Sequence, residues 1–138
     1  MLKVTPNFHF RGQGKQAIEL YKRAFGAKVK VLIDNSDANP EDLIDGGPGD
    51  LIYHAEIYIG EQRLTLTDDI DAPIPNTQPL SLLVTFETAE DVKRAYEIMA
   101  DGATIIYEMQ RTPYSSCFVS LVDRFGMRWE LMTEQTER

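Results

Sequence analysis

The sequence is poor in cysteine, in basic residues relative to acidic ones, and in long apolar runs. Its 138 residues include one cysteine, Cys117, so no disulfide can form within the chain. Its 14 Lys and Arg face 22 Asp and Glu, which leaves a formal net charge of −8. This negative charge argues against nucleic acid and anionic membranes as partners, because binding to either requires basic groups that neutralise phosphates. No uncharged stretch approaches the roughly 18 apolar residues of a membrane span.

The remaining composition is that of an ordinary globular protein. The hydrophobic fraction is 43% and the charged fraction 26%, so a packed core is expected. A chain of this length is typical of a single domain, which we place over residues 1–138. No basic-then-apolar leader follows Met1, and the lone thiol suits a reducing compartment, so we expect a cytoplasmic protein.

Hydrophobic alternation and helical spacing predict the same unit twice. The order is β-α-β-β-β in modules of about 1–68 and 79–134, joined by a linker at 69–78. The first helix ends at Gly26, and Thr88 caps the second. The expected strands are 4–11, 28–33, 51–59 and 63–67 in the first module, and 79–86, 104–109, 115–122 and 128–132 in the second.

Each predicted unit has one helix, which can cover only one face of its four strands. In the third strand, the alternation places Tyr53 with Ala55 on the packed face and Ile52 with His54 on the other. Polar groups on an enclosed surface suggest a pocket for a small polar or amphipathic molecule. The residues predicted on the uncovered faces are Asn7, His9, His54, Glu56, Arg63, Thr65, Thr67, Ser116, Phe118, Ser120, Arg128 and Glu130.

The last predicted strand carries a single carboxylate, Glu130, whose internal counterpart is Thr65. In a water-poor site Glu130 could act as a general acid or base; the alternative is a structural ion pair with Arg128 or Arg63.

Two histidines also face this surface in the predicted registers. His54 and Glu56, two residues apart, could form a base with its orienting partner, or a polar pair that stabilises the wall. His9 is a candidate ligand contact if the first strand's register holds. Cys117 alternates with core residues and is expected to be an inert small hydrophobe.

Residues 35–50 form a long loop with several acids, prolines and glycines. We expect a mobile, solvated segment that could act as a lid. The spacing of a calcium loop fails at Ala38.

The segment Gly12, Gly14 and Ala17 follows a strand, opens a helix and formally meets a dinucleotide-binding fingerprint. Against this reading, the preceding strand carries Asn7, His9 and Arg11, whereas a central parallel strand should be apolar on both faces. A dinucleotide-binding protein is therefore a remote alternative.

Six short motifs in order resemble the vicinal oxygen chelate superfamily of glyoxalase I, bleomycin-resistance proteins and extradiol dioxygenases, and within it the PhnB-like branch. They cover nearly the whole chain. The resemblance implies an α+β fold in which two βαβββ modules form a U-shaped half-barrel, commonly in homodimers. The motifs are residues 6–12, 17–21, 25–27, 52–55, 66–68 and 122–129.

In metal-dependent members of this superfamily, four side chains hold a divalent ion. The repeat alignment puts those positions at Thr5 or Pro6, Thr65, Ser81 and Glu130, of which only Glu130 is a usual ligand type. A displaced metal site could be built from His9, His54, Glu56 and Glu130. A divalent metal is thus a possible cofactor that the usual four positions do not support.

The leading interpretation is a homodimeric, glyoxalase-fold protein that binds a small molecule, with natural ligand unknown and catalysis unproven. Its candidate ligand contacts are His9, Glu56, Arg63, Thr65, Ser116, Phe118 and Arg128. The alternative is a metal-dependent lyase, isomerase or dioxygenase-like enzyme that uses Glu130 with His54 or His9.

Overall fold

The computed structural model describes residues 3–36, 49–69 and 80–133. The chain divides into two compact units, Met1–Ile74 and Pro75–Arg138. The predicted loop 35–50 and linker 69–78 lie mostly outside the described residues. At the two ends of that loop the backbone is paired, because Asn35 N–H donates to the Leu51 carbonyl at 2.9 Å and Ser36 N–H to that of Gly49 at 3.1 Å.

The first unit is a four-stranded mixed sheet with one helix. Its strands lie in the order β1-β4-β3-β2, with β1 parallel to β4 and the other neighbours antiparallel. Its elements are β1 (Asn7–Phe10), α1 (Gly14–Phe25), β2 (Lys28–Asp34), β3 (Ile52–Ile59) and β4 (Gln62–Asp68).

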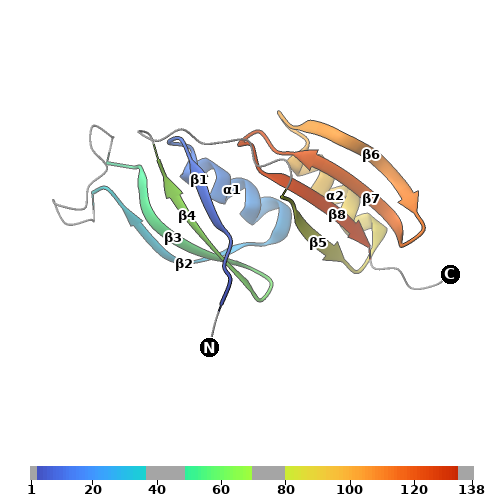
Figure 1. The fold of residues 1–138 in the computed structure, drawn as a ribbon, viewed down its shortest axis with the longest axis horizontal. Helices are drawn as coiled ribbons and strands as arrows, with labels where there is room; N and C mark the ends of the chain where they lie inside the picture. The colour runs from blue at the N-terminus through green and yellow to red at the C-terminus, as the bar shows by residue number, and fades with distance from the viewer. Residues whose placement is uncertain (1–2, 37–48, 70–79, 134–138) are drawn as a thin grey trace. The chain divides into compact units, whose positions relative to one another are not determined.

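The second unit has the same topology, in the order β5-β8-β7-β6 with β5 parallel to β8. Figure 1 shows α1 along one face of the first sheet and α2 along one face of the second. The predicted α+β fold of two βαβββ modules is confirmed. The elements of this unit are β5 (Leu82–Phe86), α2 (Ala89–Met99), β6 (Thr104–Thr112), β7 (Ser115–Val122) and β8 (Arg128–Thr133).

Both helix boundaries follow from the sequence. Helix α1 ends at Gly26, whose φ of 68° lies in the left-handed region, where glycine has no Cβ to clash. Helix α2 begins after Thr88, whose hydroxyl accepts the Asp91 N–H at 3.1 Å. Among the described residues, no helix has the length and apolar character needed to cross a membrane.

Each unit has its core between its helix and its sheet. In the first unit Tyr21 of α1 meets Phe8 of β1 edge to face. In the second, Val92 and Met99 of α2 are fully buried, as is Trp129 of β8, and the contacts of α2 are with β5, β7 and β8. This apolar burial is the main favourable term in folding of each unit.

The predicted alternation is wrong at the start of β3. Ile52 is 0% exposed, whereas Tyr53 is 38% exposed, the reverse of the expected orientation. The reason is a β-bulge: Ile33 pairs with His54 but Asp34 pairs with Ile52, so Tyr53 is an extra residue. The bulge turns Ile52 into the core without disturbing His54 and Glu56.

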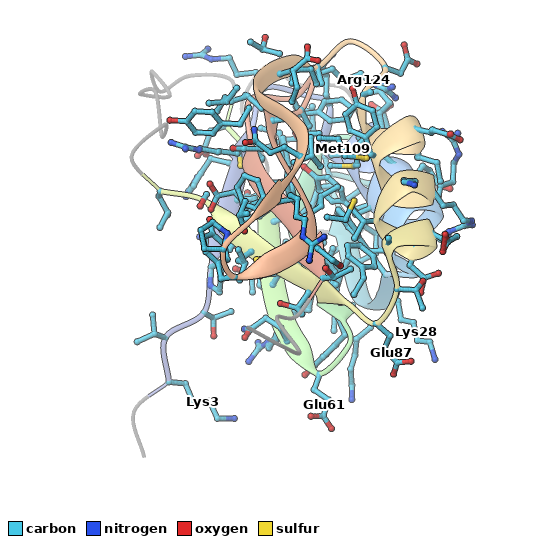
Figure 2. All side chains as sticks on the ribbon, turned by 90° about the vertical axis from the view of Figure 1, so that its right-hand side faces the viewer. Lys3, Lys28, Glu61, Glu87, Met109 and Arg124 are labelled. Atoms are coloured by element: carbon cyan, nitrogen blue, oxygen red, sulfur yellow. The ribbon has the colours of Figure 1, made fainter. Side chains whose placement is uncertain are left out.

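We call the sheet face opposite its own helix the distal face. Figure 2 shows Glu61, in the β3–β4 turn, and Lys28, at the start of β2, projecting outward at one end of the first sheet. The candidate site residues lie instead along the strands. Pairing and alternation place Asn7, His9, Val31, Ile33, His54, Glu56, Arg63, Thr65 and Thr67 on the first distal face, and Leu83, Thr85, Tyr107, Gln110, Ser116, Phe118, Ser120, Arg128, Glu130 and Met132 on the second.

Candidate functional site

One row of cross-strand neighbours runs across each distal face. Residues paired across neighbouring strands point to the same side of a sheet and lie close together. In the first unit the row is Asn7, Thr65, Glu56 and Val31. In the second it is Leu83, Glu130, Ser120 and Tyr107.

The two rows are repeat equivalents in which an acid and a hydroxyl have exchanged strands. Glu56 on β3 pairs with Thr65 on β4, whereas Ser120 on β7 pairs with Glu130 on β8. The predicted equivalence of Thr65 and Glu130 agrees with these registers. Each row therefore has one carboxylate beside one hydroxyl.

An arginine also recurs at one position in both units, two residues before Thr65 or Glu130. Arg63 Nη2 lies 2.8 Å from Glu56 Oε2, and Arg128 Nη2 lies 3.6 Å from Glu130 Oε2. The Arg128–Glu130 interaction matches one of the ion pairs that the sequence left open for Glu130, whereas Arg63, the other candidate, pairs with Glu56 instead.

Glu130 is held by three side chains of its own unit. Ser81 Oγ donates to Oε1 at 3.1 Å, and Ser120 Oγ donates to Oε2 at 3.5 Å. Arg128 completes the set as the ion-pair partner of Oε2. The side chain of Glu130 is mostly buried among these partners.

Glu56 is more tightly bound than Glu130. His54 Nε2 lies 3.0 Å from Glu56 Oε2, the same oxygen that the Arg63 guanidinium contacts. The hydrogen bond from His54, followed by that from Arg63, lowers the pKa of Glu56 below its ordinary value. The predicted His54–Glu56 pair is thus present, and Arg63 joins it.

His9 belongs to a hydrogen-bonded chain along β1 and β4. Thr65 Oγ1 donates to Asn7 Oδ1 at 2.7 Å, Asn7 Nδ2 lies 3.5 Å from His9 Nε2, and His9 Nδ1 contacts Asp69 Oδ2. The network assigns the proton to Nδ1, which donates to Asp69. Sequence reasoning missed Asn7 and Asp69 as partners of Thr65 and His9, because Asp69 was read as the first residue of the linker.

Asp68, also missed, organises the loop that precedes α1. Its side chain is 1% exposed and accepts backbone N–H groups from Gly12 at 2.9 Å, Gly14 at 3.1 Å and Ile52 at 2.8 Å. The amides that a dinucleotide phosphate would need are therefore already bonded to a carboxylate. The first sheet is also mixed rather than parallel, so the dinucleotide interpretation is wrong.

The remaining predicted residues lie toward the end of the second distal face. Ser116 Oγ is 2.7 Å from Thr133 Oγ1, in a cluster that joins the ends of β7 and β8. Phe118 is buried, and its ring meets Tyr114 edge to face. Cys117 is buried as predicted, and burial raises the pKa of its thiol, as expected of an unreactive cysteine.

Comparison with known proteins agrees with this architecture. Residues 9–131 match the model of the Glyoxalase/Bleomycin resistance protein/Dioxygenase superfamily. The chain belongs to this superfamily. Among curated proteins, this chain is similar to Protein YjdN of Escherichia coli (strain K12). The two are 22% identical over 136 residues, which cover 93% of this chain and 92% of YjdN.

Solved structures show the same fold. Protein PA1353 from Pseudomonas aeruginosa matches with a TM-score of 0.82 and 21% identity, covering 99% of this chain and 100% of that one. The PhnB protein from Bacillus cereus matches with a TM-score of 0.78 and 22% identity, covering 96% and 99%.

The residues at the four metal positions of the superfamily do not fit a divalent ion. Ser81 and Glu130 contact each other, while the Thr65 hydroxyl contacts Asn7 Oδ1 and the Pro6 carbonyl. One carboxylate with neutral hydroxyls is a weak donor set for such an ion.

The four residues of the predicted displaced metal site, His9, His54, Glu56 and Glu130, do not all contact one another. His54 and Glu56 meet, but His9 pairs with Asp69 and Glu130 with Ser81. Within residues 3–36, 49–69 and 80–133, no three His, Cys, Asp or Glu side chains are grouped so that they could hold a metal ion.

Proposed function

We propose that this protein binds a small organic molecule on the distal face of its second sheet, with Glu130 as the central polar contact. The observation that carries the proposal is the environment of Glu130. Its carboxylate bonds to Ser81 and Ser120 and faces Arg128, in a row that ends in the apolar side chains of Leu83 and Tyr107. A few convergent polar groups within an apolar surface are typical of ligand sites.

The test combines metal analysis with a compound screen. Protein purified without chelator should contain far less than one equivalent of divalent metal. Its melting temperature should nevertheless rise with some members of a library of small amphipathic molecules, because a ligand that binds only the folded state stabilises it. Stoichiometric metal that disappears in Glu130→Ala would contradict the proposal and favour a metal-dependent lyase, isomerase or dioxygenase-like enzyme.

A second candidate, an enzyme that moves a proton, is favoured by the pairing of His54 with Glu56 and of His9 with Asp69. A carboxylate that holds one ring nitrogen of a histidine orients the other as a base. The test follows exchange of an acidic C–H of a bound compound with D2O by NMR. Catalysed exchange that is lost in His54→Gln or His9→Gln would establish this candidate.

The proposal also covers the oligomeric state of the protein and its cellular compartment. We propose a homodimer, as the superfamily resemblance implies, in a reducing compartment such as the cytoplasm. The single buried cysteine supports the latter, because no disulfide can form within the chain.

A further inference from the structure

The two carboxylates differ in the contacts of their Oε2 oxygens. Glu56 Oε2 has two short contacts, 3.0 Å to His54 and 2.8 Å to Arg63. Glu130 Oε2 has two long ones, 3.5 Å to Ser120 and 3.6 Å to Arg128, both beyond the usual length of a charge-assisted hydrogen bond. Glu130 Oε2 can therefore accept a further, shorter hydrogen bond, whereas Glu56 Oε2 is already well bonded.

Large, exposed hydrophobic side chains lie at both ends of the row that contains Glu130. Leu83, on β5, is 55% exposed, and Tyr107, on β6, is 54% exposed. In the neighbouring row Met132 pairs with Phe118, and the ring of Phe118 meets that of Tyr114 edge to face. Exposed large apolar side chains around one mostly buried acid are informative, since such side chains are more often inside the core.

The equivalent row of the first unit differs in character. Asn7 takes the place of Leu83 and Val31 that of Tyr107, while His54 and Arg63 surround the acid. Glu56 thus lies among polar partners. Glu130 combines an apolar platform with an acceptor that has bonding capacity left.

We infer that Glu130 Oε2 accepts a hydrogen bond from an N–H group of a ligand whose apolar body lies over Leu83 and Tyr107. The inference rests on the proposed function and names the ligand class of that site. Adjacent strands lie about 4.8 Å apart, so the row from Leu83 to Tyr107 spans about 14 Å. That length accommodates an aromatic ring beside the acid. A protonated amine and a neutral amide both supply the required donor.

The test uses three probes that share a phenyl ring and differ in the polar group. Phenethylammonium carries a charged N–H donor, 3-phenylpropanamide a neutral one, and 4-phenyl-2-butanone none. Binding to the full-length protein is followed by NMR titration and melting temperature. At least one N–H probe should bind about tenfold more tightly than the ketone, the usual value of a hydrogen bond to a charged group. The two N–H probes distinguish the cationic from the neutral ligand.

Matched variants locate the contact. Glu130→Gln should weaken the N–H probe about tenfold, while Glu61→Gln, in the exposed β3–β4 turn, should leave its affinity unchanged. Leu83→Ser, at an exposed position, should weaken the probe about threefold by removing apolar contact area, without unfolding the protein. Melting curves of each variant without probe show whether it is folded.

The outcomes separate this inference from the proposed function. Equal binding of the ketone and the N–H probes, unchanged affinity in folded Glu130→Gln, or no binding of any probe would overturn the ligand class. The proposed function would still stand if the compound screen found other ligands that stabilise the protein, and it would fall if the screen found none. If Glu130→Gln does not fold, Leu83→Ser and the probe comparison still decide.

Discussion

At the scale of single residues, Asp68 is the side chain on which the loop before α1 depends. Its carboxylate satisfies three backbone N–H groups that have no place in the strand ladders. We predict that Asp68→Ala lowers the free energy of unfolding by about 3 kcal/mol, because buried amide donors lose their acceptor. Urea denaturation measures the change. The neighbouring Asp69→Ala, at a half-exposed position where the carboxylate meets His9 and no backbone amide, is the control; a similar small loss in both variants would contradict the assigned role.

Glu56 makes the folding stability of the protein depend on pH. His54 and then Arg63 lower the pKa of Glu56 below its ordinary value near 4.5, so the folded state holds the carboxylate ionised more strongly than the unfolded state does. The stability that Glu56 contributes is complete above its unfolded pKa and is lost as the pH falls through its folded pKa.

The corresponding measurement compares wild type with Glu56→Gln in urea from pH 7 to pH 3. We predict that the difference in unfolding free energy is constant down to about pH 5 and shrinks below that, because wild-type Glu56 then becomes protonated. Glu61→Gln, in the exposed β3–β4 turn, should show no such trend. A difference that grows toward acid pH would show that the pKa is raised instead.

At the scale of elements, the two helices begin differently although their units are repeats. Thr88 caps α2 through its hydroxyl, whereas Gln13, at the equivalent position of α1, makes no side-chain cap hydrogen bond. We predict that Thr88→Ala lowers unfolding free energy by about 1 kcal/mol and that Gln13→Ala changes it little. Thermal and urea denaturation of both variants provide the comparison; equal effects would contradict the cap assignment.

The strands and helices also show how much of the fold can be predicted from sequence patterns. Period-two alternation identified every strand, and helical spacing ended by Gly26 identified α1, because local sterics and burial impose these periods. Ile52 and Tyr53 were placed on the wrong faces. A bulge depends on how β3 pairs with β2, and that pairing joins segments far apart in the chain.

At the scale of the whole molecule, duplication explains the fold but not the chemistry of its two faces. The registers of the two sheets are equivalent, yet the first distal face carries a polar network around Glu56 and the second an apolar platform around Glu130. Each copy keeps an arginine at the equivalent position, and a carboxylate beside a hydroxyl that have exchanged strands. Divergence lies mainly in the residues that flank them.

The proposed homodimer is tested on the whole molecule. Light scattering should give a mass twice the 15.7 kDa of one chain at micromolar concentration. A homodimer is the expected state because closed twofold assemblies are the commonest among soluble oligomers. A monomeric mass over the whole concentration range would overturn this part of the proposal while leaving ligand binding by one chain untouched.

The sequence by itself determined the repeated βαβββ order, the helix ends at Gly26 and Thr88, and the set of polar residues opposite the helices, because alternation and capping are local. Only the tertiary structure decided which partners those residues take. Asp69 reaches His9, Asp68 binds the glycine amides, and Ser81 meets Glu130 across 49 residues of chain. These contacts require strands to be brought side by side, and strand register, rather than local pattern, determines that geometry.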